Sequence, residues 1–168
     1  MNANEVPAYD KSDNATGCCP RFHPEAWENL SLRFEEKLFA RAKTVGLFHI
    51  PLNMGSVFTK SWAAIEKAGA VPTGFVVLSR DLSAWRAEHL FAIDREVPGL
   101  EMVRLTGDFV TKVFEGPFSH APRWCEAMKK EVADKGRKLA DLYFFYTTCP
   151  RCSKVYGKNY VVGVARVE

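Results

Sequence analysis

The chain has 168 residues, which is enough for one domain with a hydrophobic core and too few for two ordinary domains. Apolar residues make up 47% of it and charged residues 26%, so a largely disordered or collagen-like chain is excluded. The formal charge of +3 comes from basic residues scattered among acidic ones, which argues against nucleic-acid binding.

Residues 1–24 are polar and show neither a strand period nor a helix period, which predicts a flexible or irregular tail before one domain over residues 25–168. The tail contains no apolar stretch typical of a secretory signal, and no apolar run approaches the ~20 residues of a membrane-spanning helix. Five cysteines without an export signal favour a reducing compartment, where they remain thiols or bind metal. We therefore expect a cytoplasmic protein without membrane contact.

A first unit over residues 41–97 begins with a β-branched and aromatic run at 43–50, which predicts a strand. Apolar residues at helical spacing over 58–68 predict a helix, and a glycine follows as its stop. Residues 74–78 and 85–93 then predict two further strands.

A second unit over residues 101–168 repeats this order. A strand is predicted at 107–115, and an apolar stripe at helical spacing predicts a helix at 121–132. Residues 142–148 and 159–167 predict the last two strands, each apolar on both faces. The two units together predict a duplicated β-α-β-β arrangement.

With an extra strand or hairpin near residues 30–40, the fold class is α+β, with a mostly antiparallel sheet of about eight strands and two main helices. Two helices cannot cover both faces of so large a sheet. We therefore expect apolar sheet surface to line a central groove, and we expect function there.

Twelve phenylalanines, five tyrosines and four tryptophans exceed what the core of one domain needs. A cleft walled by such rings binds flat or cationic organic molecules by burial of area and by cation–π attraction. The candidate lining residues are His49, Trp85, Phe91, Phe118, Trp124, Tyr143, Phe145, Tyr146, Tyr156 and Tyr160. The alternative is that each ring belongs to the core, above all Trp124, which lies on a helix face.

Two carboxylates on apolar strands, Glu88 and Glu115, are candidates for chemistry. A carboxylate between aromatic walls has a raised pKa, and it then acts as counter-ion to a cation or as a general acid or base. The alternative for Glu88 is a surface ion pair with a basic residue of a neighbouring strand. His49 and His89 on strands are open to both a structural and a functional interpretation.

The cysteines form two close pairs, Cys18-Cys19 and the C-x-x-C of Cys149 and Cys152. Four thiolates are a ligand set for structural zinc, which would tie the tail to the end of the sheet. A redox role and ordinary thiols are the alternatives. We expect no other cofactor, because the chain lacks a nucleotide-binding loop, a G-x-S-x-G and an H-E-x-x-H motif.

The turn Phe-Glu-Gly-Pro-Phe at 114–118, which leads into a helix carrying Trp124, resembles the gyrase-inhibitor-like (GyrI-like) family of small-molecule-binding domains. The Cys-Cys-Pro start, Phe-His-Ile-Pro-Leu-Asn and Cys-Pro-x-Cys followed by Tyr-Gly-x-Asn-Tyr are similar to stand-alone bacterial members labelled hydrolases. The resemblance implies a groove between two repeats that accepts aromatic, often cationic compounds. Some members look like hydrolases of electrophilic drug-like molecules that use a pocket glutamate and tyrosine. Here Tyr146 is kept, but Phe144 occupies the acidic position, so Glu88 or Glu115 would have to replace it.

Three functions follow from these patterns. The first is binding or sequestration of aromatic or cationic small molecules in the aromatic cleft. The second is hydrolysis of electrophilic small molecules, with Glu88 or Glu115 as base and Tyr146 as donor. The third is a zinc-stabilised scaffold. The sequence leaves open the ligand, the occurrence of turnover and the oligomeric state.

Overall fold

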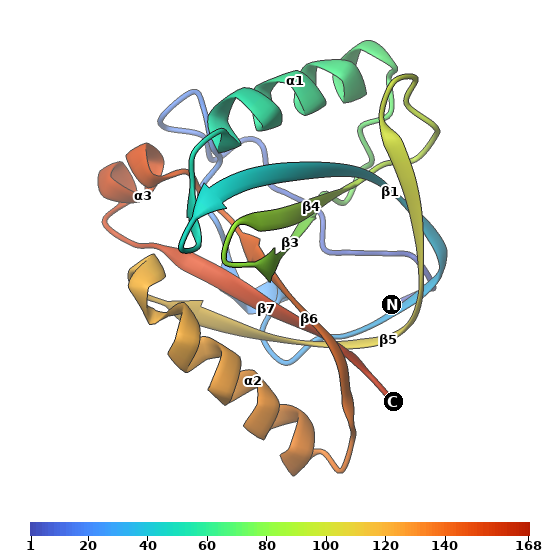
Figure 1. The fold of residues 1–168 in the computed structure, drawn as a ribbon, viewed down its shortest axis with the longest axis vertical. Helices are drawn as coiled ribbons and strands as arrows, with labels where there is room; N and C mark the ends of the chain where they lie inside the picture. Colours follow the sequence, from blue (N-terminus) through green and yellow to red (C-terminus); the bar gives the residue numbers. More distant parts are fainter.

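The computed structural model describes residues 1–168 and has a mixed α+β fold (Figure 1). None of its helices has the length and apolar character needed to cross a membrane. The strands are β1 (Ser31–Leu47), β2 (Ile50–Pro51), β3 (Val77–Ser83), β4 (Arg86–Ala92), β5 (Glu101–Glu115), β6 (Leu139–Tyr146) and β7 (Tyr160–Val167). The helices are α1 (Met54–Lys67), α2 (Ala121–Asp134) and α3 (Pro150–Tyr156).

Six of the seven strands close into a barrel in the order β1-β4-β3-β6-β7-β5, with β5 pairing back onto β1. Every pairing is antiparallel, so the predicted α+β class and mostly antiparallel sheet are confirmed. The link between β3 and β6 is the weakest, with Ser79 and Phe144 as its one paired position. The duplicated β-α-β-β arrangement and the GyrI-like resemblance stay predictions.

The sheet has seven strands rather than about eight because the segment predicted as a separate strand or hairpin at 30–40 continues into β1. β1 pairs with β5 along its first part and with β4 along its second. A bulge between Phe34 and Lys37, with Glu36 at φ +51°, lets this strand bend. Because of this bend, β1 can pair with both β5 and β4, and these pairings close the barrel.

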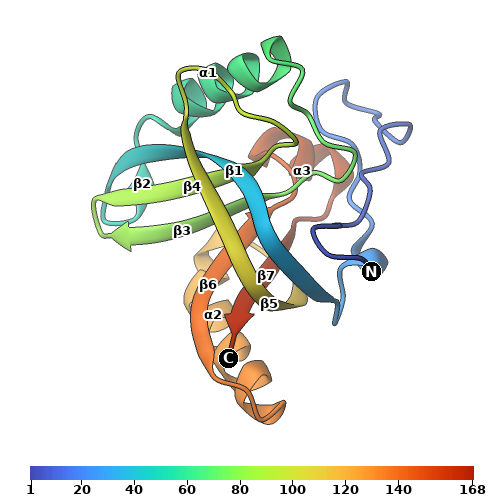
Figure 2. The same ribbon diagram turned by 90° about the vertical axis from the view of Figure 1, so that its right-hand side faces the viewer.

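The barrel interior is filled by side chains, with Phe34, Phe39 and Phe109 wholly buried. The N-terminal segment runs along the barrel near α3 and adds Val6 and Phe22 to this core (Figure 2). Residues 1–24, expected as a tail, are therefore largely without regular structure but packed against the barrel.

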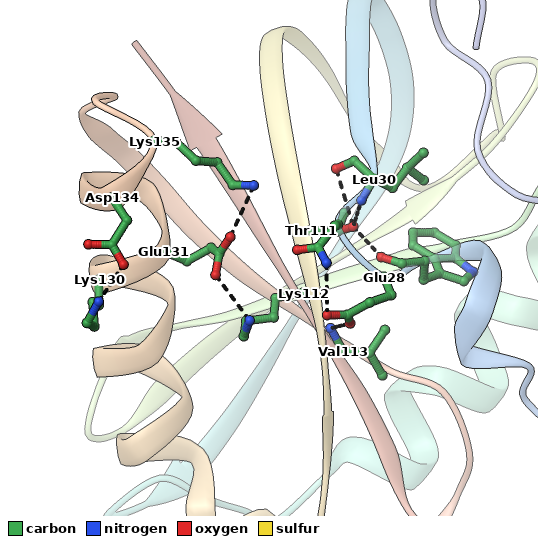
Figure 3. A network of polar contacts seen from close by, with 11 residues as sticks. Glu28, Leu30, Thr111, Lys112, Val113, Lys130, Glu131, Asp134 and Lys135 are labelled. Atoms are coloured by element: carbon green, nitrogen blue, oxygen red, sulfur yellow. Dashed lines mark hydrogen bonds and ion pairs between the residues drawn. The ribbon is translucent and has the colours of Figure 1, made fainter.

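A polar network attaches residues 27–30, which follow the N-terminal segment, to β5 and links β5 to α2 (Figure 3). The buried Thr111 hydroxyl donates to the carbonyl of Trp27 and accepts from the N–H of Leu30. Glu28 accepts a 2.8 Å hydrogen bond from the N–H of Val113. On the other side of β5, Lys112 contacts Glu131 of α2 at 3.1 Å. The segment before β1 thus continues the hydrogen bonding of the sheet.

Helices α1 and α2 cover separate parts of the outer barrel wall (Figures 1 and 2). Ile65 of α1 is wholly buried in a cluster that includes Phe91 of β4. Met128 of α2 packs so closely on β7 that a Cβ at Gly163 would lie 2.6 Å from its sulfur. The outer wall between the two helices, around β3 and β6, is left partly open, with Tyr146 38% exposed.

Candidate functional site

The rings predicted to line one cleft do not come together. Tyr143 and Phe145 are buried in the barrel interior, where the ring of Trp27 lies 5.4 Å from that of Phe145. Phe91 is buried beneath α1, and Trp124 is buried between α2 and the wall. Closure of the barrel explains the burial of Tyr143 and Phe145, since the inner faces of the strands cover one another, whereas the two helices cover Phe91 and Trp124.

Tyr156 and Tyr160 lie beside the N-terminal segment. The Tyr160 ring is 5.9 Å from that of Phe22, and the guanidinium of Arg21 lies 4.5 Å over Tyr156. The space between these residues is about 20 Å³, which is on the order of one water molecule. No organic ligand fits there.

A larger open groove, about 460 Å³, lies elsewhere and contains none of the predicted residues. Its walls mix Lys37, Arg95 and Arg104 with Glu36, Asp94 and Glu96. Lys37 is buried and donates to the carbonyl of Asn4 at 2.7 Å, so its amine is already used by the chain.

Glu88 lies inside the barrel, two positions from the core residue Leu90, and is 2% exposed. Its Oε1 accepts a 2.5 Å hydrogen bond from Arg80 Nε. Arg41 Nε lies 3.0 Å from Oε2, without the alignment of a hydrogen bond. Arg80 also contacts Asp141 at 2.7 Å. With two guanidinium groups beside it, Glu88 has the geometry of a structural ion pair.

Glu115 ends β5 and is exposed, in register with Tyr160. Its neighbour Phe114 packs outward against Trp124, so alternation along the strand turns Glu115 to the other side. Tyr146 faces outward, with its ring 5.4 Å from Phe118 and 6.4 Å from Phe144. The structure therefore brings neither Glu88 nor Glu115 to the face that carries Tyr146.

Tyr146 has a different acidic neighbour. Burial raises the pKa of its phenol to about 12, with contributions from the negative charge of Asp81 and from Cys125. The phenol thus stays protonated at neutral pH and is a hydrogen-bond donor. Asp81 Oδ2 in turn lies 2.7 Å from His49 Nδ1, and both side chains are more than half exposed. We call His49, Asp81 and Tyr146 the outer site.

His49 is held over Asp81 by a tight hairpin. Phe48 and His49 form the two-residue loop between β1 and β2, and both have positive φ, +47° and +67°. Such loops favour asparagine and glycine, so two bulky residues in this conformation are strained. The His49 N–H donates to the carbonyl of Ala84 at 2.9 Å, and the ring of Phe48 lies 5.1 Å from Trp85. These contacts hold the strained loop in place.

An exposed apolar surface surrounds this hairpin, formed by the end of β1, by β2 and by the turn between β3 and β4. We call it the apolar rim. Its members are 48% to 70% exposed, and they are Val45, Leu47, Phe48, Ile50, Leu52, Leu82 and Trp85. Several exposed apolar side chains around one turn make this end of the sheet a candidate binding surface. Of the sequence candidates, His49 and Trp85 lie at the hairpin and Tyr146 and Phe118 on the nearby wall.

Sequence reasoning missed Asp81, which stands in a turn-like Ser-Arg-Asp-Leu-Ser stretch and carries no motif. It also left His89 open. His89 is buried beneath α1, with ring nitrogens 2.9 Å from the Thr44 hydroxyl and 2.8 Å from that of Ser79. Burial lowers the pKa of His89 to about 4, so the ring is neutral at pH 7. This histidine is structural.

The two cysteine pairs do come together, because the N-terminal segment passes the start of α3. The sulfur atoms of Cys18, Cys19, Cys149 and Cys152 all lie within 4.8 Å of one another. A hydrogen bond with the Thr16 hydroxyl is the largest influence on Cys152 and helps to lower the pKa of its thiol to about 6. The fifth cysteine, Cys125, lies apart on α2.

The family model described as "Bacterial hydrolase" matches residues 9–167 of the chain. A comparison with curated proteins returns no match. A crystal structure of a hydrolase from Listeria innocua is similar at 15% identity and a TM-score of 0.57, covering 84% of this chain and 92% of the other. An uncharacterized conserved protein from Listeria innocua is similar at 13% identity and a TM-score of 0.59, covering 84% and 93%.

At these identities the two structures show a shared fold and nothing about a shared substrate. The family match covers nearly the whole chain and agrees with the resemblance to stand-alone bacterial proteins labelled hydrolases. The chain belongs to the bacterial hydrolase family.

Proposed function

We propose that the chain hydrolyses small electrophilic molecules with an apolar body at the outer site. The observation that carries this proposal is the 2.7 Å contact between His49 Nδ1 and Asp81 Oδ2, on the open part of the wall that also bears Tyr146. Membership of the bacterial hydrolase family supports the reaction class. The roles first expected for Glu88 and Glu115 pass to groups on the outer face.

His49 is the general base. When Nδ1–H donates to Asp81, the tautomer is fixed and Nε2 is left as an acceptor for a proton of water. The water oxygen then forms a bond with the electrophilic carbon, and its proton passes to Nε2. As the bond to the leaving group breaks, the imidazolium returns this proton to the leaving atom. Asp81 positions the ring and stabilises its charged form.

Tyr146 is the hydrogen-bond donor to the oxygen or leaving atom on which negative charge develops. A phenol whose pKa is raised to about 12 keeps its proton through the reaction and donates without being consumed. Its hydroxyl forms no hydrogen bond within the chain and is free for this contact.

The apolar rim supports a substrate with an aromatic or branched apolar body. The ring pair of Phe48 and Trp85, 5.1 Å apart, stands beside the hairpin that carries His49. Burying the exposed part of such rings contributes roughly 25 cal/mol per Å². The same rings next to the carboxylate of Asp81 favour a second candidate function, the binding of flat cationic molecules without turnover.

The test is hydrolysis of a panel of chromogenic activated esters and epoxides by purified protein. The variant His49→Gln should lose about 100-fold or more in turnover, as expected for removal of a general base. The matched control is His23→Gln, because His23 also contacts an aspartate, Asp13, at 3.2 Å but lies in the N-terminal segment. Equal turnover by His49→Gln and the wild type would refute the proposal. Quenching of tryptophan fluorescence by planar cations, with no turnover of any panel member, would favour the binding function instead.

A further inference from the structure

The four-cysteine cluster joins two parts of the chain that are distant in sequence. Cys18 and Cys19 come from the N-terminal segment, whereas Cys149 and Cys152 flank the first turn of α3. All four are free thiols, and their sulfur atoms lie within 4.8 Å of one another, with 3.8 Å between those of Cys18 and Cys19. Cys152 is wholly buried, Cys19 and Cys149 are partly buried, and Cys18 is exposed.

We infer that Cys18, Cys19, Cys149 and Cys152 bind one structural Zn²⁺ ion. A tetrahedral zinc with Zn–S bonds of about 2.3 Å sets its four sulfur atoms about 3.8 Å apart. The separation between the sulfurs of Cys18 and Cys19 already has this value, and the remaining pairs are at most 4.8 Å apart. Small side-chain rotations therefore suffice to complete the site.

The surrounding groups are arranged to support thiolate ligands. The backbone N–H of Cys152 points at Cys149 Sγ at 3.5 Å, a contact that stabilises negative charge on sulfur. The Thr16 hydroxyl lies 3.3 Å from Cys152 Sγ and accepts from the N–H groups of Cys18 and Cys19. Once Cys152 gives up its proton to bind metal, this hydroxyl can turn and donate to the sulfur.

The loop carrying Cys18 and Cys19 is also fixed from the other side. The Tyr156 hydroxyl donates a 2.6 Å hydrogen bond to the carbonyl of Cys19. The guanidinium of Arg21 lies 4.5 Å over the ring of that tyrosine, so both side chains help to hold the loop.

Four protein ligands leave no coordination position for water or substrate, so the ion is structural rather than catalytic. Its effect is to fasten the N-terminal segment, with the buried Phe22 just after the ligands, to the end of the barrel. This inference does not rest on the proposed hydrolase function, because none of the four cysteines belongs to the outer site.

The first test is metal analysis of protein purified without chelator. We expect one zinc per chain in the wild type and in Cys125→Ser, whose cysteine lies outside the cluster, and less than about one tenth in Cys149→Ser/Cys152→Ser. The double variant should also lose its zinc-dependent gain in melting temperature, roughly 10 °C or more for a site of this kind. Zinc retained at one equivalent in the double variant would overturn the assignment.

A second test uses the wild type alone and holds even where the double variant fails to fold. A mercurial reagent titrated onto the native protein should release one zinc to a chromogenic chelator as four thiols react. Cobalt(II) added to the reduced, metal-free protein should give the visible absorption of a tetrahedral thiolate complex. The alternative is that the cluster forms disulfides. In that case the wild-type protein would lack zinc, and mass spectrometry would show a mass lower by two hydrogens for each cysteine pair. Iron in place of zinc would likewise overturn the inference.

Discussion

Asp81 and Glu88 lie on neighbouring strands of one hairpin, but their side chains point to opposite sides of the barrel wall. Glu88 on β4 is 2% exposed and contacts the guanidinium groups of Arg80 and Arg41. Asp81 on β3 is 54% exposed and contacts His49 alone. The carboxylate of Glu88 is thus neutralised by arginines, whereas the carboxylate of Asp81 is available on the surface. The face of the strand, rather than the residue type, decides which carboxylate can take part in chemistry.

The largest effect should come from Asp81→Asn. An amide at this position cannot hold the His49 tautomer or stabilise its charged form, so kcat should fall by about 10²–10³-fold. We expect KM to change by less than about threefold, because Asp81 positions the base and does not bind the substrate. Steady-state kinetics on the best substrate of the panel check this split. An unchanged kcat would remove Asp81 from the outer site.

Glu88→Gln should act on stability instead. Removing the carboxylate leaves Arg80 and Arg41 without their shared anionic partner, which should lower the free energy of unfolding by about 2–4 kcal/mol. Both arginines are 25–31% exposed, so the loss stays at the lower end of the range for buried pairs. Urea denaturation measures it. The matched control is Glu101→Gln, since Glu101 also contacts Arg41 but is half exposed and should cost less than about 1 kcal/mol. Equal effects of the two variants would contradict the comparison.

His89 sharpens the comparison, because it faces the same side of the wall as Asp81 but lies beneath α1. Burial lowers its pKa from the ordinary value of 6.5 to about 4, so between these pH values the unfolded chain binds a proton that the folded chain does not. The contribution to stability is therefore present above pH 6.5 and is lost as the pH falls toward 4, by about 3 kcal/mol. In His89→Gln this part of the pH dependence of unfolding should disappear. A stability profile between pH 4 and 7 that is the same in variant and wild type would contradict it.

Both main helices could be predicted from the sequence, because their signals are local. The stripe at 58–68 lies in α1 and ends at its C-cap residue, and the stripe at 121–132 falls within α2, each followed by a glycine. α3 was not predicted, since its seven residues are too few for a periodic pattern and a glycine follows them at once.

Closure of the barrel could not be predicted, and the expected groove depended on it. The alternation of side chains along a strand indicates which face is buried, but it does not indicate which strand lies beside it. The pairing that closes the barrel, between β1 and β5, brings together Ser31 and Val110, which are far apart in the sequence. An open sheet with two helices would leave apolar surface uncovered, as the sequence argument assumed. A closed sheet buries that surface against itself, which moves Tyr143 and Phe145 from the expected pocket into the core.

For the outer site and the four-cysteine cluster, too, the sequence indicates candidate residues but not which of them lie close together. His49, Trp85 and Tyr146 could be picked out by residue type, but Asp81 becomes relevant only through the turn that brings His49 back over β3. Likewise the two cysteine pairs are visible in the sequence, whereas their approach to within 4.8 Å depends on the path of the N-terminal segment.

That path also shapes how the protein comes to fold. Tyr9 donates a hydrogen bond to the carbonyl of Thr147, which is 138 residues later in the chain, and Phe22 packs against Phe145. During synthesis the first thirty residues leave the ribosome long before their partner strand exists. Contacts between residues so far apart in the sequence slow folding to milliseconds or longer. Until they form, the apolar side chains of the N-terminal segment stay exposed to water. We expect the nascent chain to depend on chaperones until its last two strands have emerged.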